Sequence, residues 1–144
     1  MVETIIAIDP GREKCGLAVL SRQQGVREKS VVPSIELIAS IEAYCRRYQV
    51  QAIILGDGTS SAEKAVNIQV LLNRQVHNNI TLHMIDEYKS TELARTRYWQ
   101  ENPPCGWQRL IPVTMQVPPV PVDDYVAVLL GEKYFKNNLL EKEE

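Results

Sequence analysis

The sequence is poor in cysteine and histidine and carries little excess charge of either sign. Its three cysteines, Cys15, Cys45 and Cys105, are an odd number without CxxC spacing, so neither a disulfide framework nor a zinc site is indicated. His77 and His83 lack the spacing of metal ligands. Lysine and arginine number 16 against 18 aspartates and glutamates, a formal net charge of −2. This balance argues against a protein that binds nucleic acid strongly by charge alone.

Long hydrophobic runs are also missing. No apolar run approaches the roughly 20 residues that span a bilayer, and residues 1–4 lead directly into an apolar strand without a signal peptide. Hydrophobic residues make up 44% of the 144 positions, enough for the full core of a single globular domain. We expect one domain over residues 1–140, an acidic tail over residues 141–144, and a soluble, cytoplasmic protein.

The N-terminal stretch IIAIDPGREKCGLAVL predicts a buried strand, a tight turn and a return strand. Ile5 to Ile8 form a continuous apolar run, typical of a strand that is buried on both faces. The run ends on Asp9, Pro10-Gly11 favours a turn, and Gly16 opens the return strand over residues 17–20. A carboxylate at the end of a buried strand is costly unless a cation meets it. We therefore expect Asp9 to bind a divalent metal ion.

The remaining chain alternates between strand and helix patterns. Short runs predict strands at residues 26–32, 52–55 and 82–85, the first of them an edge strand because charges interrupt it. Helical spacing predicts helices that begin near Ser34, Ser60, Ser90 and Asp123, with Ser34 as an N-cap and Ser60 in a capping box with Glu63. Helical crossovers join the first, fourth and fifth strands, which should be parallel. The pattern predicts an α/β fold with a mixed five-stranded sheet and helices on its faces.

Residues 102–122 differ in composition from the rest of the chain. Six of the eight prolines lie here, so neither a helix nor a central strand should persist. A loop of this length within a compact domain is often functional. Trp107 within it fits two explanations, stacking on a nucleic-acid base or closing over the core.

Acidic residues stand where the predicted strands end and where the last helix begins: Asp9, Asp57, Asp86-Glu87 and Asp123-Asp124. Parallel strands bring their carboxyl ends to one edge of a sheet, where α/β proteins form their sites. Clusters of oxygen ligands suit Mg²⁺ or Mn²⁺. Each acid also has a structural explanation, because aspartate forms turns and caps helices.

Four segments together resemble the YqgF family: IIAIDPGREKCGLAVL, AIILGDGTSS, MIDEYKSTELA and PVDDYVAVLLGEKYF. They follow the family in order and spacing and cover nearly the whole chain. The resemblance implies an RNase H-like fold, related to RuvC-type Holliday-junction resolvases. It also implies metal-dependent nuclease activity, linked to maturation of the 5′ end of pre-16S rRNA.

The family pattern places one acid in each of three elements, and these match Asp9, Glu87 and Asp123. The resemblance implies that these three are catalytic and hold Mg²⁺ or Mn²⁺, with Asp9 bridging two ions. It favours Asp123 over Asp124 because of the distance to the closing Tyr-Phe pair. For Asp57 and Asp86 we expect a structural role or a supporting role around the metal ligands. Tyr88 departs from the family, which usually has arginine there, and Asp57 adds a carboxylate beside the expected site.

Basic residues near these acids are candidate contacts for substrate phosphates. The first candidates are Arg12, Lys14 and Lys89; Arg95, Arg97 and Arg109 are further ones, although an ordinary solvated helix face explains the last group equally well. The expected partner is nucleic acid, with structured RNA favoured over branched DNA, and no membrane is expected.

Two other functions fit the same residues. A non-catalytic binding module would keep the fold without the chemistry, as the departures at Tyr88 and Asp57 suggest. The strand–Asp–x–Gly–strand hairpin also resembles the phosphate loop of actin-like ATPases, although those enzymes close two such domains over ATP and this chain has room for one. The sequence does not indicate the oligomeric state.

Overall fold

The computed structural model describes residues 3–58, 60–74, 79–86, 90–112, 116 and 118–143, with the side chains of residues 90, 91, 107 and 138–143 left out. Five strands are present: β1 (Thr4–Asp9), β2 (Lys14–Ser21), β3 (Gly25–Pro33), β4 (Ala52–Gly56) and β5 (Thr81–Ile85). The helical elements are the 3₁₀ turns η1 (Ser34–Glu36) and η2 (Gly106–Leu110) and the helices α1 (Leu37–Arg47), α2 (Ser61–Arg74), α3 (Ser90–Glu101) and α4 (Asp123–Glu143).

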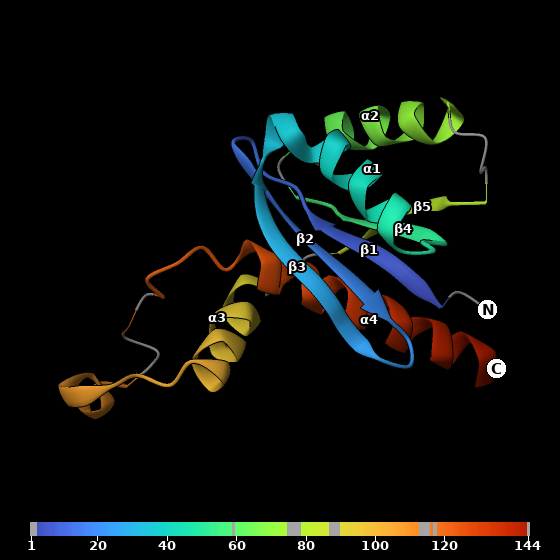
Figure 1. Cartoon of the computed structure of the whole chain (residues 1–144). Helices are drawn as coiled ribbons and strands as arrows, with labels where there is room; N and C mark the ends of the chain where they lie inside the picture. Colours follow the sequence, from blue (N-terminus) through green and yellow to red (C-terminus); the bar gives the residue numbers. More distant parts are fainter. Residues whose placement is uncertain are drawn as a thin grey trace.

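The five strands form one mixed sheet in the order β3-β2-β1-β4-β5 (Figure 1). β1 pairs antiparallel with β2 and parallel with β4, and β5 continues parallel to β4. The predicted meander followed by parallel strands is therefore confirmed. β3 is an edge strand, as its interleaved charges predicted.

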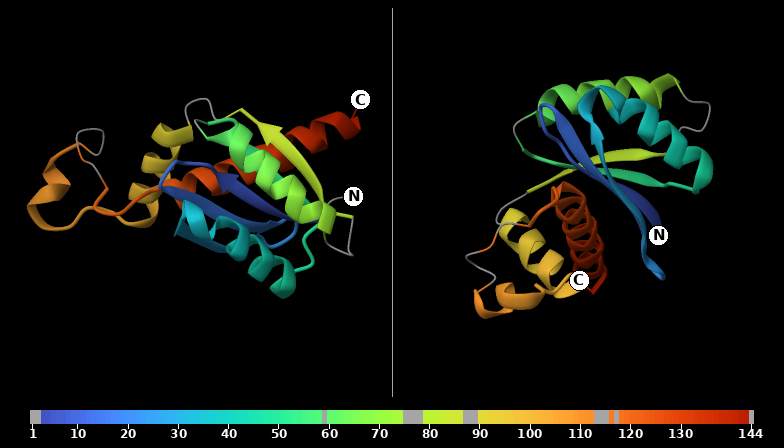
Figure 2. Two further views of the ribbon diagram at one scale, coloured as in Figure 1. Left: turned by 90° about the horizontal axis from the view of Figure 1, so that it is seen from above. Right: turned by 60° about the vertical axis from the view of Figure 1, so that its left-hand side comes forward.

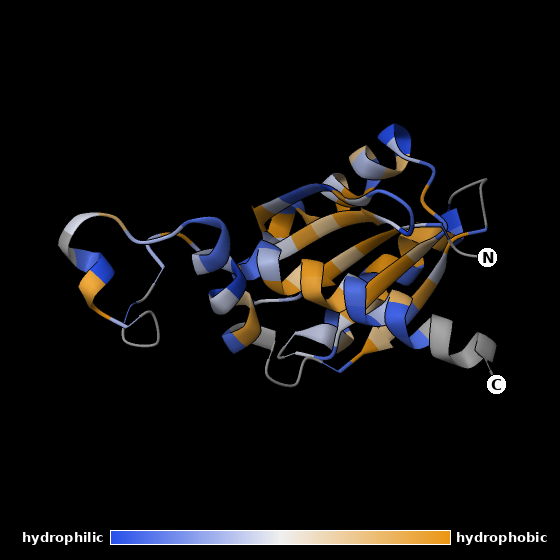
Figure 3. Ribbon diagram, turned by 90° about the horizontal axis from the view of Figure 1, so that it is seen from below, coloured by the Kyte–Doolittle hydropathy of each residue, from blue (hydrophilic) through white to orange (hydrophobic). Residues whose placement is uncertain are grey.

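Side chains alternate between the two faces of the buried strands, so the sheet carries a core on each side. Ile6 and Ile8 of β1 pack against α1 and α2, whereas Ile5 and Ala7 pack against α4 and α3. Figure 2 shows these helix pairs on opposite sides of the sheet, and Figure 3 shows that apolar residues dominate the strands between them. Burial on both faces explains why β1 reads as a continuous apolar run rather than an alternating one.

Three predicted features differ from the structure. Ser34 does not cap α1: it lies in η1, and its hydroxyl donates to the carbonyl of Gly11 at 2.8 Å, because the turn after β1 lies against it. The proline-rich segment is not wholly irregular, since η2 forms within it. α4 continues to Glu143, through most of the segment expected as an acidic tail.

The proline-rich segment extends away from the sheet beyond the end of α3 (Figures 1 and 2). Its Leu110 is 87% exposed, whereas Leu130 of α4 is completely buried. Among the described residues, no helix has the length and apolar character needed to cross a membrane.

Candidate metal site

The carboxyl ends of three parallel strands meet at one edge of the sheet. The register sets the end of β1 level with the end of β4, and the last residues of β4 and β5 pair with each other. Asp9 ends β1, Asp57 follows β4 and Asp86 follows β5. Because neighbouring strands lie about 4.8 Å apart, these carboxylates are spaced along a single edge.

Asp9 points to the face that α4 covers. It shares the alternation of Ile5 and Ala7, whose side chains pack against α4. Its partner across the β1–β2 ladder is Gly16. Asp9 is half-buried, so its carboxylate stands at the boundary between the core and solvent.

Gly16 is where α4 reaches the sheet. A Cβ placed on Gly16 would lie 1.9 Å from the carbonyl oxygen of Asp123 and 2.8 Å from the backbone nitrogen of Asp124. Only a residue without a side chain allows this approach. The first residue of α4 therefore lies directly on the residue that pairs with Asp9, which brings together two acids more than 100 positions apart in the sequence.

One carboxylate oxygen of Asp123 is buried without a hydrogen bond from the described residues. Its Oδ2 is excluded from solvent and has no hydrogen-bond partner among the described residues, although Lys14 Nζ lies 3.5 Å away as an ion pair. The Lys14 side chain is 52% exposed, so this pair is a weak one. A buried oxygen without a hydrogen bond costs free energy, and a cation at this position would remove that cost.

Asp124, next in sequence, is satisfied by other groups. Its Oδ2 lies 3.1 Å from Lys29 Nζ, and its Oδ1 accepts a hydrogen bond from the backbone N–H of Tyr125 at 2.9 Å. Burial lowers the pKa of Lys29, but the hydrogen bond and charge of Asp124 outweigh it, so the pKa lies above its ordinary value. Lys29 also lies over the ring of Tyr125, 4.3 Å from its centroid. The two neighbouring aspartates thus have different surroundings. Of the two, Asp123 is the one with a carboxylate oxygen that could bind a cation.

Divalent cations fit this edge of the sheet. Asp9 and the unsatisfied oxygen of Asp123 provide hard oxygen ligands of the kind that Mg²⁺ and Mn²⁺ prefer. Glu87, the third predicted ligand, lies outside the described residues, as do Tyr88 and Lys89. Within the described part of the chain, no group of three or more potential ligand side chains converges. The backbones of two of the three predicted acids, Asp9 and Asp123, thus both lie next to Gly16.

The two remaining acids are both exposed. Asp57 donates its backbone N–H to the carbonyl of Ile85 at 3.0 Å, which extends the β4–β5 pairing by one residue. The carbonyl of Asp86 accepts a hydrogen bond from Lys133 Nζ at 3.0 Å. Their backbones thus join β4 to β5 and β5 to α4.

The candidate phosphate contacts lie in different places. Lys14 is at the site, beside Asp123, whereas Arg12 lines a cleft on the other face of the sheet. Arg97 forms ion pairs with Glu101 and Glu132, and Arg109 Nε donates to the carbonyl of Gly106. Of the described candidates, Lys14 is the one that contacts a predicted metal ligand.

Sequence reasoning missed Gly16 as a site residue. The sequence pattern predicts only that Gly16 opens a return strand, yet its missing side chain decides where α4 contacts the sheet. A glycine inside a strand pattern is a known sign of close backbone approach, and this signal was available in the sequence.

No protein-family model matches the sequence, and no curated protein matches it either. Solved structures do match in three dimensions. The Fowlpox virus resolvase in complex with Holliday junction DNA gives a TM-score of 0.62 at 12% identity, covering 94% of this chain and 99% of that one. RuvC from Thermus thermophilus, in complex with a Holliday junction substrate, gives 0.60 at 15% identity, covering 95% and 96%.

These similarities extend over whole chains and define the fold class. The protein has an RNase H-like α/β fold, with the mixed sheet and helices that it shares with RuvC-type resolvases. At 11–15% identity the matches establish the fold alone. The resemblance to the YqgF family stays a prediction from the residues.

Proposed function

We propose that this protein is a divalent-metal-dependent nuclease that hydrolyses phosphodiester bonds in structured nucleic acid. The observation that carries the proposal is the approach of α4 to Gly16, which sets the unsatisfied Asp123 carboxylate beside the strand that ends on Asp9. The shared fold of two resolvases solved with Holliday junction substrates supports a nucleic-acid substrate.

In this proposal, Asp9, Asp123 and Glu87 hold Mg²⁺ or Mn²⁺. The bound metal would activate a water for attack on the phosphorus and neutralise charge on the departing oxygen. Asp9 lies at the end of β1 and Asp123 at the start of α4, and the close approach of α4 to Gly16 fixes the position of these two elements. Lys14, ion-paired with Asp123 and half exposed, exchanges this contact for a phosphate oxygen of the substrate.

Two substrates follow from different observations. The YqgF-like segments favour precursor 16S rRNA, with processing at its 5′ end. The structural similarity to the two resolvases favours four-way DNA junctions. Both substrates are structured nucleic acids with accessible phosphodiesters, and the same metal site would serve either.

Asp9→Asn and Asp123→Asn should abolish cleavage. Each change removes a negatively charged metal ligand, so we expect the rate with Mg²⁺ or Mn²⁺ to fall by about a thousandfold, equivalent to roughly 4 kcal/mol of activation free energy. Cleavage of precursor 16S rRNA and of synthetic four-way DNA junctions, followed on denaturing gels, measures this effect and also decides the substrate.

The matched control is Asp124→Asn. It changes the neighbouring aspartate, whose partners are Lys29 and the N–H of Tyr125, and it should leave cleavage close to that of the wild type. Undiminished cleavage by Asp9→Asn would refute the proposed site. Calorimetry with Mn²⁺ distinguishes the nuclease from a non-catalytic binding module. The nuclease should bind Mn²⁺, and Asp9→Asn and Asp123→Asn should abolish that binding, whereas a non-catalytic module should show no such binding.

A further inference from the structure

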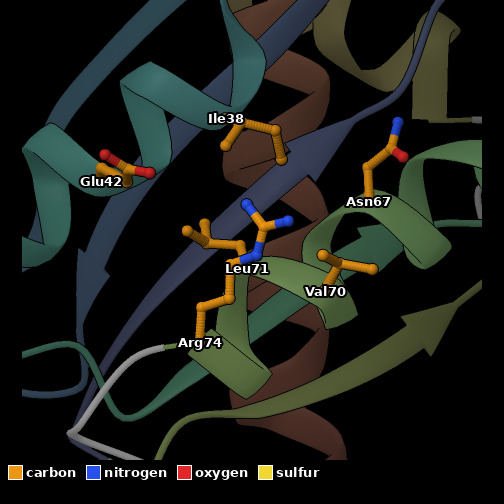
Figure 4. A pocket seen from close by; sticks show the side chains of 6 residues that line it. All are labelled: Ile38, Glu42, Asn67, Val70, Leu71 and Arg74. Atoms are coloured by element: carbon orange, nitrogen blue, oxygen red, sulfur yellow. The ribbon is translucent and has the colours of Figure 1, made fainter.

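A second cleft lies on the opposite face of the sheet from the Asp9–Asp123 site. It has a volume of about 390 Å³ and lies between the β1–β2 turn, the start of α1 and the first turns of α2; its lining includes Arg12, Ser34, Ser60, Glu63, Lys64 and Asn67. Through Ile38 and Asn67 it continues into a groove of about 440 Å³ between α1 and α2, shown in Figure 4. Arg12 is three residues after Asp9, so at most about 11 Å of chain separates the two regions.

Lys64 occupies a position where a lysine is unfavourable. It lies on the inward face of α2, four residues before Ile68, which is completely buried, and only 9% of Lys64 is exposed. Its ammonium has no hydrogen-bond or ion-pair partner among the described residues. The stem of Lys64 is packed along the apolar face of α2, and its ammonium lines the cleft, where a ligand can reach it.

The same lysine lies at the wrong end of its helix. α2 begins at Ser61, so Lys64 lies in the first turn, where the helix dipole is positive and repels a cation. The N–H of Ser61 donates to the carbonyl of Gly58 and that of Lys64 to the carbonyl of Ser60, whereas the N–H groups of Ala62 and Glu63 have no backbone acceptor among the described residues. The helix dipole opposes a lysine here, and an anion in the cleft would offset that repulsion.

The cleft contains the kinds of hydrogen-bond donor and positive charge that bind phosphate in proteins. Lys64 and Arg12 line it together, and the hydroxyl of Ser60 stands at the N-terminus of α2. Ser34 contributes less, because its hydroxyl already donates to the carbonyl of Gly11. Glu63 is the opposing charge in the lining, but it is exposed and lies beyond ion-pair distance of both cations.

We propose that this cleft binds a backbone phosphate of the nucleic-acid substrate, held by Lys64, Arg12 and the N-terminus of α2. It would anchor the strand beside the sheet edge that carries Asp9, so the substrate would contact both faces of the domain at this edge. The identity of the phosphate donor rests on the proposed function, whereas the phosphate site itself rests on the unpartnered lysine and the cleft.

Lys64→Met tests the proposal because methionine keeps the length and apolar stem of lysine. Binding of a fluorescent four-way junction and of a precursor rRNA fragment is titrated in EDTA, which prevents cleavage, over a range of KCl concentrations. We expect Lys64→Met to weaken binding roughly tenfold at low salt and to reduce the slope of log Kd against log salt by about one. The melting temperature should change little, since methionine keeps the packed apolar stem.

Lys136→Met is the matched control, because Lys136 is an exposed lysine of α4 on the other side of the sheet. It should leave the salt slope unchanged. Arg12→Met changes the same cleft, but from an exposed turn. If Lys64→Met does not fold, the salt dependence of binding by Arg12→Met tests the proposal instead. Wild-type slopes in both cleft variants would overturn the proposal, even if the protein cleaves nucleic acid in an Asp9-dependent manner.

A second arm uses inorganic phosphate and a thermal-shift measurement. Stabilisation of the wild type by millimolar phosphate, lost in Lys64→Met, supports a phosphate site whether or not the protein is a nuclease. If that stabilisation occurs while no nucleic acid binds, the source of the phosphate is a small molecule and the nucleic-acid assignment is overturned. If neither probe distinguishes wild type from Lys64→Met, the phosphate site itself is refuted.

Discussion

At the scale of single residues, Gly16 controls the geometry of the proposed site. It pairs with Asp9 across the sheet, and the backbone of Asp123 lies against its α-carbon. Both aspartates are held relative to this one position. A side chain here would have to displace backbone rather than the end of a flexible side chain, and backbone within a packed fold yields little.

Gly16→Ala should therefore destabilise the fold and impair the site. The added methyl would overlap the carbonyl of Asp123, and overpacking of this kind costs about 1–3 kcal/mol. Urea denaturation measures the loss of stability. Cleavage per folded molecule should also fall, because α4 must move away from β2 and take Asp123 with it.

Gly131→Ala is the control for this prediction. Its added methyl would lie 2.6 Å from Cδ1 of Leu20, a side-chain atom that can move, in the same helix but two turns beyond Asp123. It should lower stability while cleavage per folded molecule stays near that of the wild type. Equal loss of activity in both variants would show that Gly16 has no particular role in the site.

At the scale of elements, α1 is attached to the edge strand β3 by polar contacts. The hydroxyls of Tyr44 and Ser30 form a hydrogen bond of 2.7 Å, and Arg47 Nη1 donates to both carboxylate oxygens of Glu28 at 2.8 and 2.7 Å. The Arg47 hydrogen bond lowers the pKa of Glu28, and burial raises the pKa of Tyr44. The contacts that hold α1 on β3 thus depend on the protonation states of Tyr44 and Glu28.

Stability should decline above about pH 10, and Tyr44→Phe should weaken this decline. In the unfolded chain the Tyr44 phenol loses its proton at a lower pH than in the fold, so rising pH favours unfolding. Urea denaturation between pH 8 and pH 11 measures the slope. A residual decline should persist in the variant, because the pKa values of Tyr125 and Lys29 are also raised.

Ser30→Ala distinguishes ionisation from the loss of a hydrogen bond. It removes the same 2.7 Å contact but keeps the phenol, so the alkaline decline should remain. At pH 7 both variants should lose about 1 kcal/mol, the usual net value of one hydrogen bond. An identical alkaline slope in wild type and Tyr44→Phe would contradict the assignment.

At the scale of the whole molecule, the described residues divide into a two-sided core and an outlying proline-rich segment. The cores on the two faces share the strands β1, β2 and β4, so they should unfold together. The middle of the proline-rich segment exposes Leu110 and extends away from both cores, whereas Val122 at its end packs against the core under α4 (Figure 1). Its contribution to stability should be small.

Two identical substitutions test this division. Leu130→Ala removes a completely buried side chain where α4 packs on the sheet and should cost about 2–5 kcal/mol. Leu110→Ala changes a side chain that is 87% exposed and should alter the free energy of unfolding by less than about 0.5 kcal/mol. Chemical denaturation measures both, and a comparable loss in the two variants would show that the proline-rich segment packs as part of the core.

Much of the fold could be predicted from the sequence because its signals are local. The continuous apolar run of β1 follows from burial on both faces, and the charges in β3 follow from its place at the edge. The prolines of residues 102–122 excluded regular strands and long helices for reasons of backbone chemistry alone. The helix at Ser34 was misjudged, because the partner of that hydroxyl is Gly11, 23 positions away.

The site was predicted only in part. The residues themselves placed Asp9 and the Asp123-Asp124 pair where strands end and a helix begins, since these are local features. The choice between the two aspartates came from a family resemblance, and the structure adds its own reason in the pairing of Asp124 with Lys29. Lys64 was missed, although its spacing from Ile68 already placed it on the apolar stripe of its helix.

The sequence by itself determined the order of strands and helices and the chemical types available at their ends, because hydrophobic periodicity and turn chemistry act over a few residues. Only the tertiary structure decided that α4 begins on Gly16, that the Oδ2 atom of Asp123 is buried without a hydrogen bond from the described residues, and that Lys64 lines a cleft. These facts depend on contacts between segments up to about a hundred residues apart, and such contacts arise from packing, which no local pattern specifies.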